Sequence, residues 1–439
     1  MSKGRLPGDK QVWRIAAPMI LSNISAPLLG MVDTGVTGHL DNSMYLGAVA
    51  IGSTIFGFLY TGMNFLRMGT TGIAAQRYGA DDNDGLRVAL GQAVIVSLLV
   101  AFALIAAQVP IGRLAMNLLG PEPAVETSAL QYFGIRIWSA PGTLANYVLI
   151  GWFLGLQNAR VPLLIFLTIN ITNIVLDLFF VLGLGMKVDG VALASVIAEY
   201  SGLLVGLGFA ASALRKRAGH WPFARLFNVR AYAAFFAINA HLFVRTMALM
   251  FTFGFVTAQG ARLGGVILAA NAVLMNLQTL TAFALDGIAH AAEALVGKAV
   301  GQKNREALER SVRLSLKWSV IFALGFCAIY VAFGPLLIRT LTDLPDVREA
   351  AMRFLPWLIV SPIVSVWSFL YDGVFVGATR ARAMRDIMLF STVFIFLPAW
   401  FLLQGFGNHG LWLAFTLFMA SRGVGMHIGY RRIVVPHIT

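Results

Sequence analysis

The chain has 439 residues, of which 58% are hydrophobic and only 12% are charged, and its net charge is +13. Soluble domains are about 45–50% apolar and about 25% charged, so this composition excludes a chain of two or three soluble domains. The basic residues fall between apolar segments rather than on one face, which indicates membrane topology and not nucleic-acid binding.

Twelve apolar segments are long enough to cross a bilayer, which requires about 20 mostly apolar residues. In chain order we expect them at residues 12–37, 45–76, 88–109, 125–156, 162–185, 190–214, 231–257, 264–297, 314–337, 349–377, 385–404 and 410–430. An even number of spans puts both termini on one side. Because the loops on that side carry most of the Lys and Arg residues, we expect it to be the cytoplasm. The sequence therefore predicts an all-α polytopic membrane protein, with no cleavable signal peptide.

The two halves of the chain match each other. The segment GWFLGLQNAR at 151–160 aligns with GVFVGATRAR at 373–382, and DGVALASV at 189–196 aligns with HGLWLAFT at 409–416. A third match pairs Gly79 with Gly301 at an offset of 222 residues. In the same match Asn83 pairs with Asn304 at an offset one residue shorter. Offsets close to 220 predict a duplicated six-helix unit, and two six-helix copies keep the same orientation in the membrane.

We therefore expect two six-helix lobes related by a parallel internal repeat. The N-terminal lobe is expected at 1–213, a basic cytoplasmic linker at 214–230, and the C-terminal lobe at 231–439. In such an architecture the substrate site lies between the bundles, and alternating access follows from their relative rocking.

Asp33 is the first embedded carboxylate, in LLGMVDTGVTGHLD at 28–41, and it follows Pro27 by six residues. A charge at the bilayer centre costs about 3–15 kcal/mol, so such a group faces a cavity or a partner. Pro27 is expected to kink the helix and to carry Asp33 toward or away from a cavity. A desolvated Asp33 could exchange protons near neutral pH; the alternative is a helix or turn cap near the outer mouth. Its counterpart at the 222 offset is Phe255, so the coupling groups are expected in the N-terminal half.

Asn173 and Asp177 lie one helical turn apart in NITNIVLDLFF at 170–180, and the next segment contributes Ser195. Their amide, carboxylate and hydroxyl oxygens could hold a proton or coordinate Na⁺, and the alternative is an interhelical polar clamp. Glu199, one turn beyond Ser195, either extends this relay or pairs with Arg136 or Arg67.

Asp286, His290 and Glu293 follow at i, i+4 and i+7 in FALDGIAHAAEALVG. This resembles the spacing of metal ligands, but the sequence offers no further His or Cys nearby, so we expect no metal site. A cavity-lining or salt-bridged stripe is the preferred interpretation, with Arg245 as a candidate partner. Asp372 precedes a Gly-x-x-x-Gly motif that permits close helix contact. It is expected either to belong to a functional polar network of the C-terminal lobe or to form a structural ion pair with an embedded arginine.

Five segments carry a resemblance to a known family: PMILSNISAPLLGMVDTGVTGHLD, NITNIVLDLFFVLGLGMKVDGVALASVIAEYSG, ANAVLMNLQTLTAFALDGIAHAAEALVGKAVG, YDGVFVGATRARAMR and GNHGLWLAF. They resemble the multidrug and toxic compound extrusion (MATE) family, and within it the DNA-damage-inducible protein F (DinF) branch, along essentially the whole chain. The resemblance implies two six-helix lobes in a V around a large cavity. It also implies antiport of cationic or amphipathic compounds against H⁺ or Na⁺.

The resemblance assigns roles to individual residues. The family's first-helix acid falls on Asp33 and its kinking proline on Pro27. Its fifth-helix pair falls on Asn173 and Asp177, and its sixth-helix threonine is Ser195 here, which keeps the hydroxyl group. Other branches carry a seventh-helix acid for Na⁺, and FFAINAHLFVRTMALMFTF has none, although Asp372 matches their tenth-helix acid.

These observations predict a proton-coupled efflux antiporter of the bacterial inner membrane, with Na⁺ coupling as the alternative. We expect it to act as a monomer among membrane lipids on small amphipathic or cationic organic substrates, with no cofactor and no nucleic-acid partner. A rival is a flippase for lipid-linked precursors, which should line its cavity with several Arg or Lys residues. An enzyme is not expected, because the sequence has no HExxH motif, no His/Cys metal set and no Ser/His pair at useful spacing.

Overall fold

A computed structural model describes the backbone of residues 6–38 and 42–438. Within these ranges the side chains of residues 26–31, 33, 34, 229–231, 234, 437 and 438 are not among those described. Throughout the described ranges every regular element is a helix, as the composition and the apolar segments predicted.

The helices of the first half follow the expected segments closely. Their bounds are α1 Asp9–Thr37, α2 Ser43–Met63, α3 Phe65–Gly79, α4 Asn83–Ala106, α5 Gln108–Leu119, α6 Pro123–Arg136, η1 Ile137–Ser139, α7 Ala140–Gly155, α8 Arg160–Asp177, η2 Leu178–Gly183 and α9 Val188–Arg215.

The second half begins with a single helical turn, α10, and continues with long helices. Their bounds are α10 Phe223–Leu226, α11 Val229–Arg262, α12 Gly265–Gly301, α13 Arg305–Leu341, α14 Pro345–Gly377, α15 Ala381–Phe390, η3 Ser391–Phe396, α16 Leu397–Leu403, η4 Gln404–Phe406, α17 Asn408–Gly429, η5 Tyr430–Val434 and η6 Val435–Ile438.

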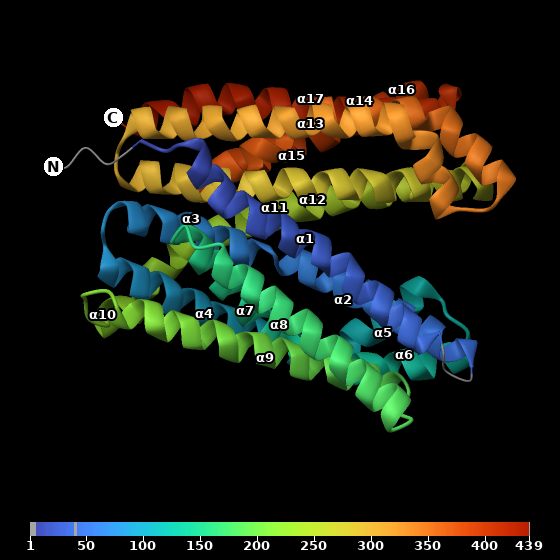
Figure 1. The fold of residues 1–439 in the computed structure, drawn as a ribbon, viewed down its shortest axis with the longest axis horizontal. Helices are drawn as coiled ribbons and strands as arrows, with labels where there is room; N and C mark the ends of the chain where they lie inside the picture. The colour runs from blue at the N-terminus through green and yellow to red at the C-terminus, as the bar shows by residue number, and fades with distance from the viewer. Residues whose placement is uncertain (1–5, 39–41, 439) are drawn as a thin grey trace. The chain divides into compact units, whose positions relative to one another are not determined.

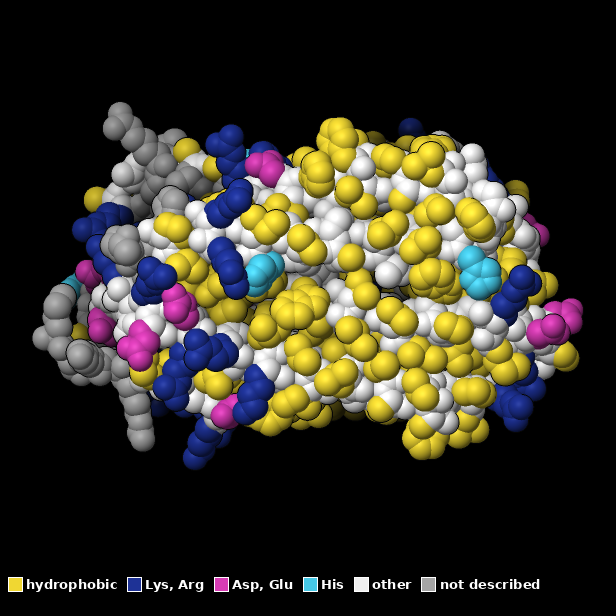
Figure 2. Space-filling model, turned by 90° about the horizontal axis from the view of Figure 1, so that it is seen from above, with side chains coloured by type: hydrophobic (Ala, Val, Ile, Leu, Met, Phe, Trp, Pro, Cys, Tyr) yellow, Lys and Arg dark blue, Asp and Glu magenta, His cyan; other side chains and the backbone are white. Residues whose placement is uncertain are grey.

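Ten helices of the described residues are long and apolar enough to cross a membrane. Helix α1 and the continuous helical segment from Pro123 to Gly155 complete the twelve spans predicted from the sequence. The face drawn in Figure 2 carries hydrophobic side chains over most of its middle, with Lys and Arg side chains gathered beside them. This distribution is typical of a surface that meets acyl chains and is bounded by basic residues at the interface.

The described residues form two compact units, one drawn from Leu21–Ala234 and the other from Met1–Ile20 and Phe235–Thr439. The start of α1 thus packs with the C-terminal half. The two compact units therefore meet at two places in the sequence, within α1 and just after the 214–230 linker. Asp9 accepts hydrogen bonds from Nε1 of Trp318 at 2.6 Å and from Nζ of Lys317 at 3.2 Å. The ring of Trp13 packs edge-on against that of Trp318, with centroids 5.0 Å apart.

In the N-terminal unit, α7 is the central helix. It packs against α3, α4 and α9, while α8 lies along α9 and α2 along α6 (Figure 1). Helix α7 is buried over its whole length except for the half-buried Tyr147, which explains why its sequence is apolar on every side. The C-terminal unit is built around α14, which packs against α12, α13 and α17.

The internal repeat is visible in the closest helix contacts of both units. A Cβ atom on Gly151 would come within 3.0 Å of the carbonyl oxygen of Arg67, and one on Gly373 would come within 3.0 Å of that of Ala289. Gly373 follows Gly151 by 222 residues, and Ala289 follows Arg67 by the same number. At each seam only glycine lets the backbones approach this closely.

Turns and caps repeat at the same offset. The left-handed residue Asp81 (φ 56°) corresponds to Lys303 (φ 52°). Asp82 caps α4 by accepting from the N–H of Gly85 at 2.7 Å, and Asn304 caps α13 by accepting from the N–H of Ala307 at 2.9 Å. The structural equivalent of Asn304 is therefore the cap Asp82 and not Asn83, which removes the slip in the sequence match.

Candidate functional site

Pro27 and Asp33 belong to helix α1, but their side chains lie outside the described residues. The nearest described anchor is Ser25, whose hydroxyl donates to the carbonyl of Ser22 at 2.7 Å. Nδ2 of Asn170 donates to Oγ of Ser25 at 2.9 Å and to its carbonyl oxygen at 3.3 Å. This contact joins α8 to α1 before the two helices reach their carboxylates.

Helices α8 and α9 bring the predicted oxygen ligands together. Nδ2 of Asn173 donates to Oγ of Ser195 at 3.2 Å, and both residues are buried. Asp177 lies one turn further along the same face of α8 and is fully buried. The chain continues from Asp177 into the π-helical turn Leu178–Gly183, a widened geometry that often marks functional sites in helices. Amide, hydroxyl and carboxylate groups thus share one interior region between two helices.

Glu199 accepts hydrogen bonds from α7, which packs against α9. Nδ2 of Asn146 donates to the Glu199 carboxylate oxygen Oε2 at 3.0 Å and to its carbonyl oxygen at 2.9 Å. A Cβ on Gly142 would meet the Glu199 backbone at 3.3 Å, so α7 and α9 cross closely at this point. The single amide of Asn146 therefore fixes both the main chain and the side chain of Glu199.

Arg136 supplies the positive charge near Glu199 and lies within its electrostatic range. Its guanidinium carbon lies 5.4 Å from the ring centroid of Phe56 and 6.0 Å from that of Tyr132. Aromatic faces stabilise a cation that is removed from water. The sequence had suggested an arginine partner for Glu199, and Arg136 is in range, while Asn146 makes the direct hydrogen bonds.

In the C-terminal unit, Asp372 lies between two arginines. Nη2 of Arg422 donates to Oδ2 of Asp372 at 2.9 Å, and Nη2 of Arg245 donates to the same oxygen. These side chains come from α14, α17 and α11 and are largely buried. Asp286 of α12 lies within electrostatic range of Arg422. The arrangement is a buried ion-pair cluster in which Asp372 already has two cationic partners.

The three residues of the predicted stripe on α12, which are Asp286, His290 and Glu293, do not share one environment. Nδ1 of His290 lies 3.4 Å from Oε2 of Glu293, and the Glu293 side chain is buried. The carbonyl of Glu293 meets Gly377 of α14 at the second position of the Gly-x-x-x-Gly motif. Asp286 lies within electrostatic range of Arg422, and Arg245, considered as a partner of the stripe, donates to Asp372.

Three residues of these networks carried no signal in the sequence analysis: Asn146, Asn170 and Ser25. Each is a lone polar residue in an apolar helix, where a structural hydrogen bond and a functional one look alike. Arg422 lies within the last apolar segment, 410–430, and its pairing with Asp372 depends on which helices are neighbours.

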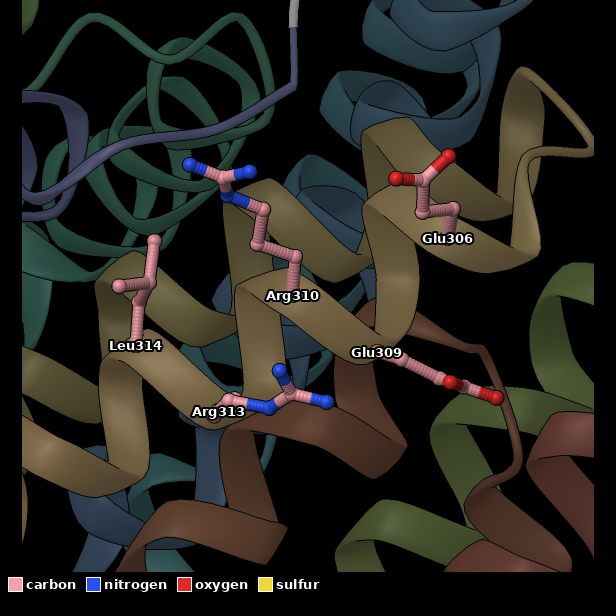
Figure 3. A pocket seen from close by; sticks show the side chains of 5 residues that line it. All are labelled: Glu306, Glu309, Arg310, Arg313 and Leu314. Carbon is pink, nitrogen blue, oxygen red and sulfur yellow. The ribbon is translucent and has the colours of Figure 1, made fainter.

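A separate pocket of about 310 Å³ lies on the surface of α13 (Figure 3). Glu306, Glu309, Arg310, Arg313 and Leu314 line it, and all of them project from that one helix. Glu309 is paired with Arg305 at 2.8 Å. None of the predicted site residues lines this pocket, so it is separate from the buried polar groups.

Comparisons with known proteins agree with this architecture. The MatE family model matches residues 18–179 and 241–401. The chain is 43% identical to DNA damage-inducible protein F of Escherichia coli K12, over 97% of this chain and 92% of that protein. It is 23% identical to the probable multidrug resistance protein NorM of Thermotoga maritima, over 77% and 74% of the two chains. A solved outward-facing structure of a multidrug resistance MATE family transporter superposes with a TM-score of 0.85 at 20% identity, covering 97% and 96% of the two chains.

Proposed function

The chain belongs to the MatE family, a family of multidrug efflux transporters, and we propose that it exports small amphipathic or cationic organic compounds in exchange for protons. The relatives named as multidrug resistance proteins support this class of substrate. We further propose that it works as a monomer in a bacterial inner membrane, with both termini in the cytoplasm. Its functional lobes are then residues 1–213 and 231–439, joined by the basic linker and working by alternating access.

The distribution of charge between the two units is the observation that carries the choice of site. In the C-terminal unit, Asp372 is already matched by two guanidinium groups, with which an added cation would have to compete. In the N-terminal unit, buried Asp177 lies one turn from the Asn173–Ser195 hydrogen bond. Ionisable groups inside a membrane bundle mark proton and ion pathways. We therefore assign coupling to the N-terminal unit and favour protons over Na⁺.

The contact between Asn170 and Ser25 supports a joint role for two carboxylates. The first and fifth spans cross the membrane in the same direction. Asp33 follows Ser25 by eight residues and Asp177 follows Asn170 by seven, which places each about 10–12 Å beyond the contact along its helix. We propose that Asp33 and Asp177 work at one level of the membrane.

In this mechanism, protons from outside neutralise Asp33 and Asp177, α1 bends at Pro27, and the bound cation is released. Loss of the protons to the cytoplasm restores the negative charge that attracts the next substrate. We place Glu199 in the same network, because it lies one turn beyond Ser195 on α9 and Asn146 of α7 holds its carboxylate. In an alternative version of this mechanism, the proton and the substrate bind one carboxylate in turn. This version also predicts that transport depends on Asp33.

Purified protein in proteoliposomes with an imposed pH gradient tests the proposal. Ethidium added without sodium should dissipate the gradient, and Asp33→Asn or Asp177→Asn should reduce this at least tenfold. Asp343→Asn is the matched control, because the Asp343 side chain is 100% exposed. Gel filtration verifies that each variant is folded. Transport that requires a sodium gradient, or full activity of both variants, would overturn the proton assignment.

A further inference from the structure

The basic linker after α9 is fixed to α4 by a buried arginine. Nη2 of Arg87 donates to the carbonyls of Leu214 at 3.0 Å and Arg217 at 2.8 Å, and Nη1 donates to those of Asn83 at 3.0 Å and Ala218 at 3.5 Å. Arg87 is only 4% exposed. Its guanidinium group therefore satisfies carbonyls at the end of α9, which a helix terminus leaves without partners.

Beyond this anchor the linker folds back along α4. Nε2 of Gln92 donates to the carbonyl of Arg225 at 3.4 Å. A Cβ on Gly91 would meet Leu226 at 2.7 Å and the ring of Trp221 at 3.3 Å. Gly91 is eight residues into α4, about 12 Å from its start at 1.5 Å per residue. Helix α4 is long and apolar enough to cross a membrane, and Gly91 is the fourth residue of the apolar segment expected at 88–109, so residues 221–226 lie beside the first turn of that segment.

This segment presents aromatic rings and positive charges outward. Trp221 is 40% exposed, Phe223 63% and Phe227 67%, although all three are large apolar side chains. Leu226 between them is buried against α4, so the exposed rings are held on a docked chain. Three exposed basic residues flank them: Arg215, Lys216 and Arg225.

We propose that residues 214–228 form an interfacial anchor that binds the headgroups of anionic phospholipids in the surrounding bilayer. Aromatic side chains are favoured where acyl chains meet headgroups, and Lys and Arg beside them attract negatively charged lipids. The depth of the segment along α4 selects a lipid partner over a soluble protein or a nucleic acid. Arg87 is a positioning residue, because it holds the backbone that carries these side chains.

Fluorescence quenching by brominated lipids tests this directly. The chain has a single cysteine, Cys327, so Cys327→Ser gives a background in which Phe223→Cys can be labelled with a fluorophore. In vesicles of phosphatidylcholine and phosphatidylglycerol, brominated phosphatidylglycerol should quench at least twice as strongly as brominated phosphatidylcholine at equal mole fraction. Leu204→Cys on α9, 71% exposed in the same unit, is the control site and should be quenched equally by both lipids.

Charge removal supplies the second arm of the test. Arg215→Gln/Lys216→Gln/Arg225→Gln should abolish the preference for the anionic lipid at position 223. The matched control, Arg431→Gln/Arg432→Gln, removes exposed basic residues at the chain end and should leave the preference unchanged.

Equal quenching by the two lipids at position 223 would overturn the proposal. Quenching by aqueous iodide in place of both lipids would overturn it as well. Phe227→Cys gives a second reporter if the first variant fails to fold, and none of these readouts depends on transport.

Discussion

Asp372 receives hydrogen bonds from Arg422 and Arg245 on a single carboxylate oxygen, Oδ2, and this joins three helices of the C-terminal unit. The two guanidinium groups take the place beside this buried acid that a bound cation would otherwise occupy. Removing one member of such a cluster leaves uncompensated charge in a low-dielectric interior, which costs more than the cluster contributes by existing.

Asp372→Asn is therefore expected to lower the free energy of unfolding by about 3–5 kcal/mol, because two guanidinium groups lose their counter-charge. Thermal unfolding in detergent measures the effect. Asp386→Asn is the control, since its pair with Arg385 is partly exposed and such pairs contribute about 0–1 kcal/mol. If Asp372→Asn melts at the wild-type temperature, the cluster is not structural.

The glycine seams give a prediction in matched pairs. Gly151→Ala and Gly373→Ala each force a methyl group into a carbonyl oxygen of the neighbouring helix, so each should cost at least about 1–3 kcal/mol. Gly57→Ala and Gly208→Ala meet nothing within 4 Å and should be neutral, or stabilise by up to about 1 kcal/mol through helix propensity. Melting temperatures of the four variants measure these differences in stability. Equal changes in all four variants would contradict the close backbone contacts at Gly151 and Gly373.

Substitutions of Ser195 distinguish a role in coupling from a purely structural hydrogen bond between helices. Ser195→Ala removes the acceptor of the Asn173 side chain, and Ser195→Thr keeps the hydroxyl group. We expect the alanine variant to shift the pH profile of transport and the threonine variant to restore it. A loss of about 1 kcal/mol in stability with an unchanged pH profile would instead indicate a clamp.

Glu199→Gln keeps the shape that accepts from Asn146 but removes the ionisable group near Arg136. If Glu199 belongs to the coupling network, the variant should fold normally and lose most proton-driven transport. Transport assays together with melting temperatures distinguish this from a simple counter-ion role, in which stability falls and the number of protons taken up per exported substrate stays constant. Glu349→Gln, outside these networks, is the control.

The start of α1 should respond to acid. The indole N–H of Trp318 and then the ammonium group of Lys317 lower the pKa of Asp9 below its ordinary value of 3.8. A lowered pKa in the folded protein means that the contact stabilises the helix start above about pH 4 and is lost as the pH falls through the lowered value. Hydrogen exchange of the first turns of α1, corrected for intrinsic rates, should show lost protection only in that acidic window. Asp9→Asn should remove the pH dependence.

Much of the fold follows from the sequence because the bilayer imposes a simple rule of length and polarity. The twelve apolar segments and the Gly-x-x-x-Gly motif at Gly373 are local patterns, and the repeat offset emerges when the two halves of the sequence are compared. The meeting of Asn173 with Ser195 was predictable because consecutive spans are usually neighbours and the spacing puts polar residues on one face.

Contacts that depend on tertiary arrangement were not predictable in the same way. Arg245 could serve several acids, and only the packing of α11 against its neighbours selects Asp372. Asn146 shows no periodicity that separates it from its apolar surroundings. The clamp of Arg87 on the linker uses backbone carbonyls, which every residue possesses and no sequence pattern reports.

The seams at Gly151 and Gly373 have a consequence for how such a molecule diverges after duplication. At each seam main chain touches main chain, and this contact depends on glycine and not on the neighbouring side chains. Side chains away from the seams and outside the buried ion pairs can therefore change in one copy while these close helix contacts stay in place. A symmetric ancestor of half the length could in this way give rise to a chain whose two sides perform different tasks.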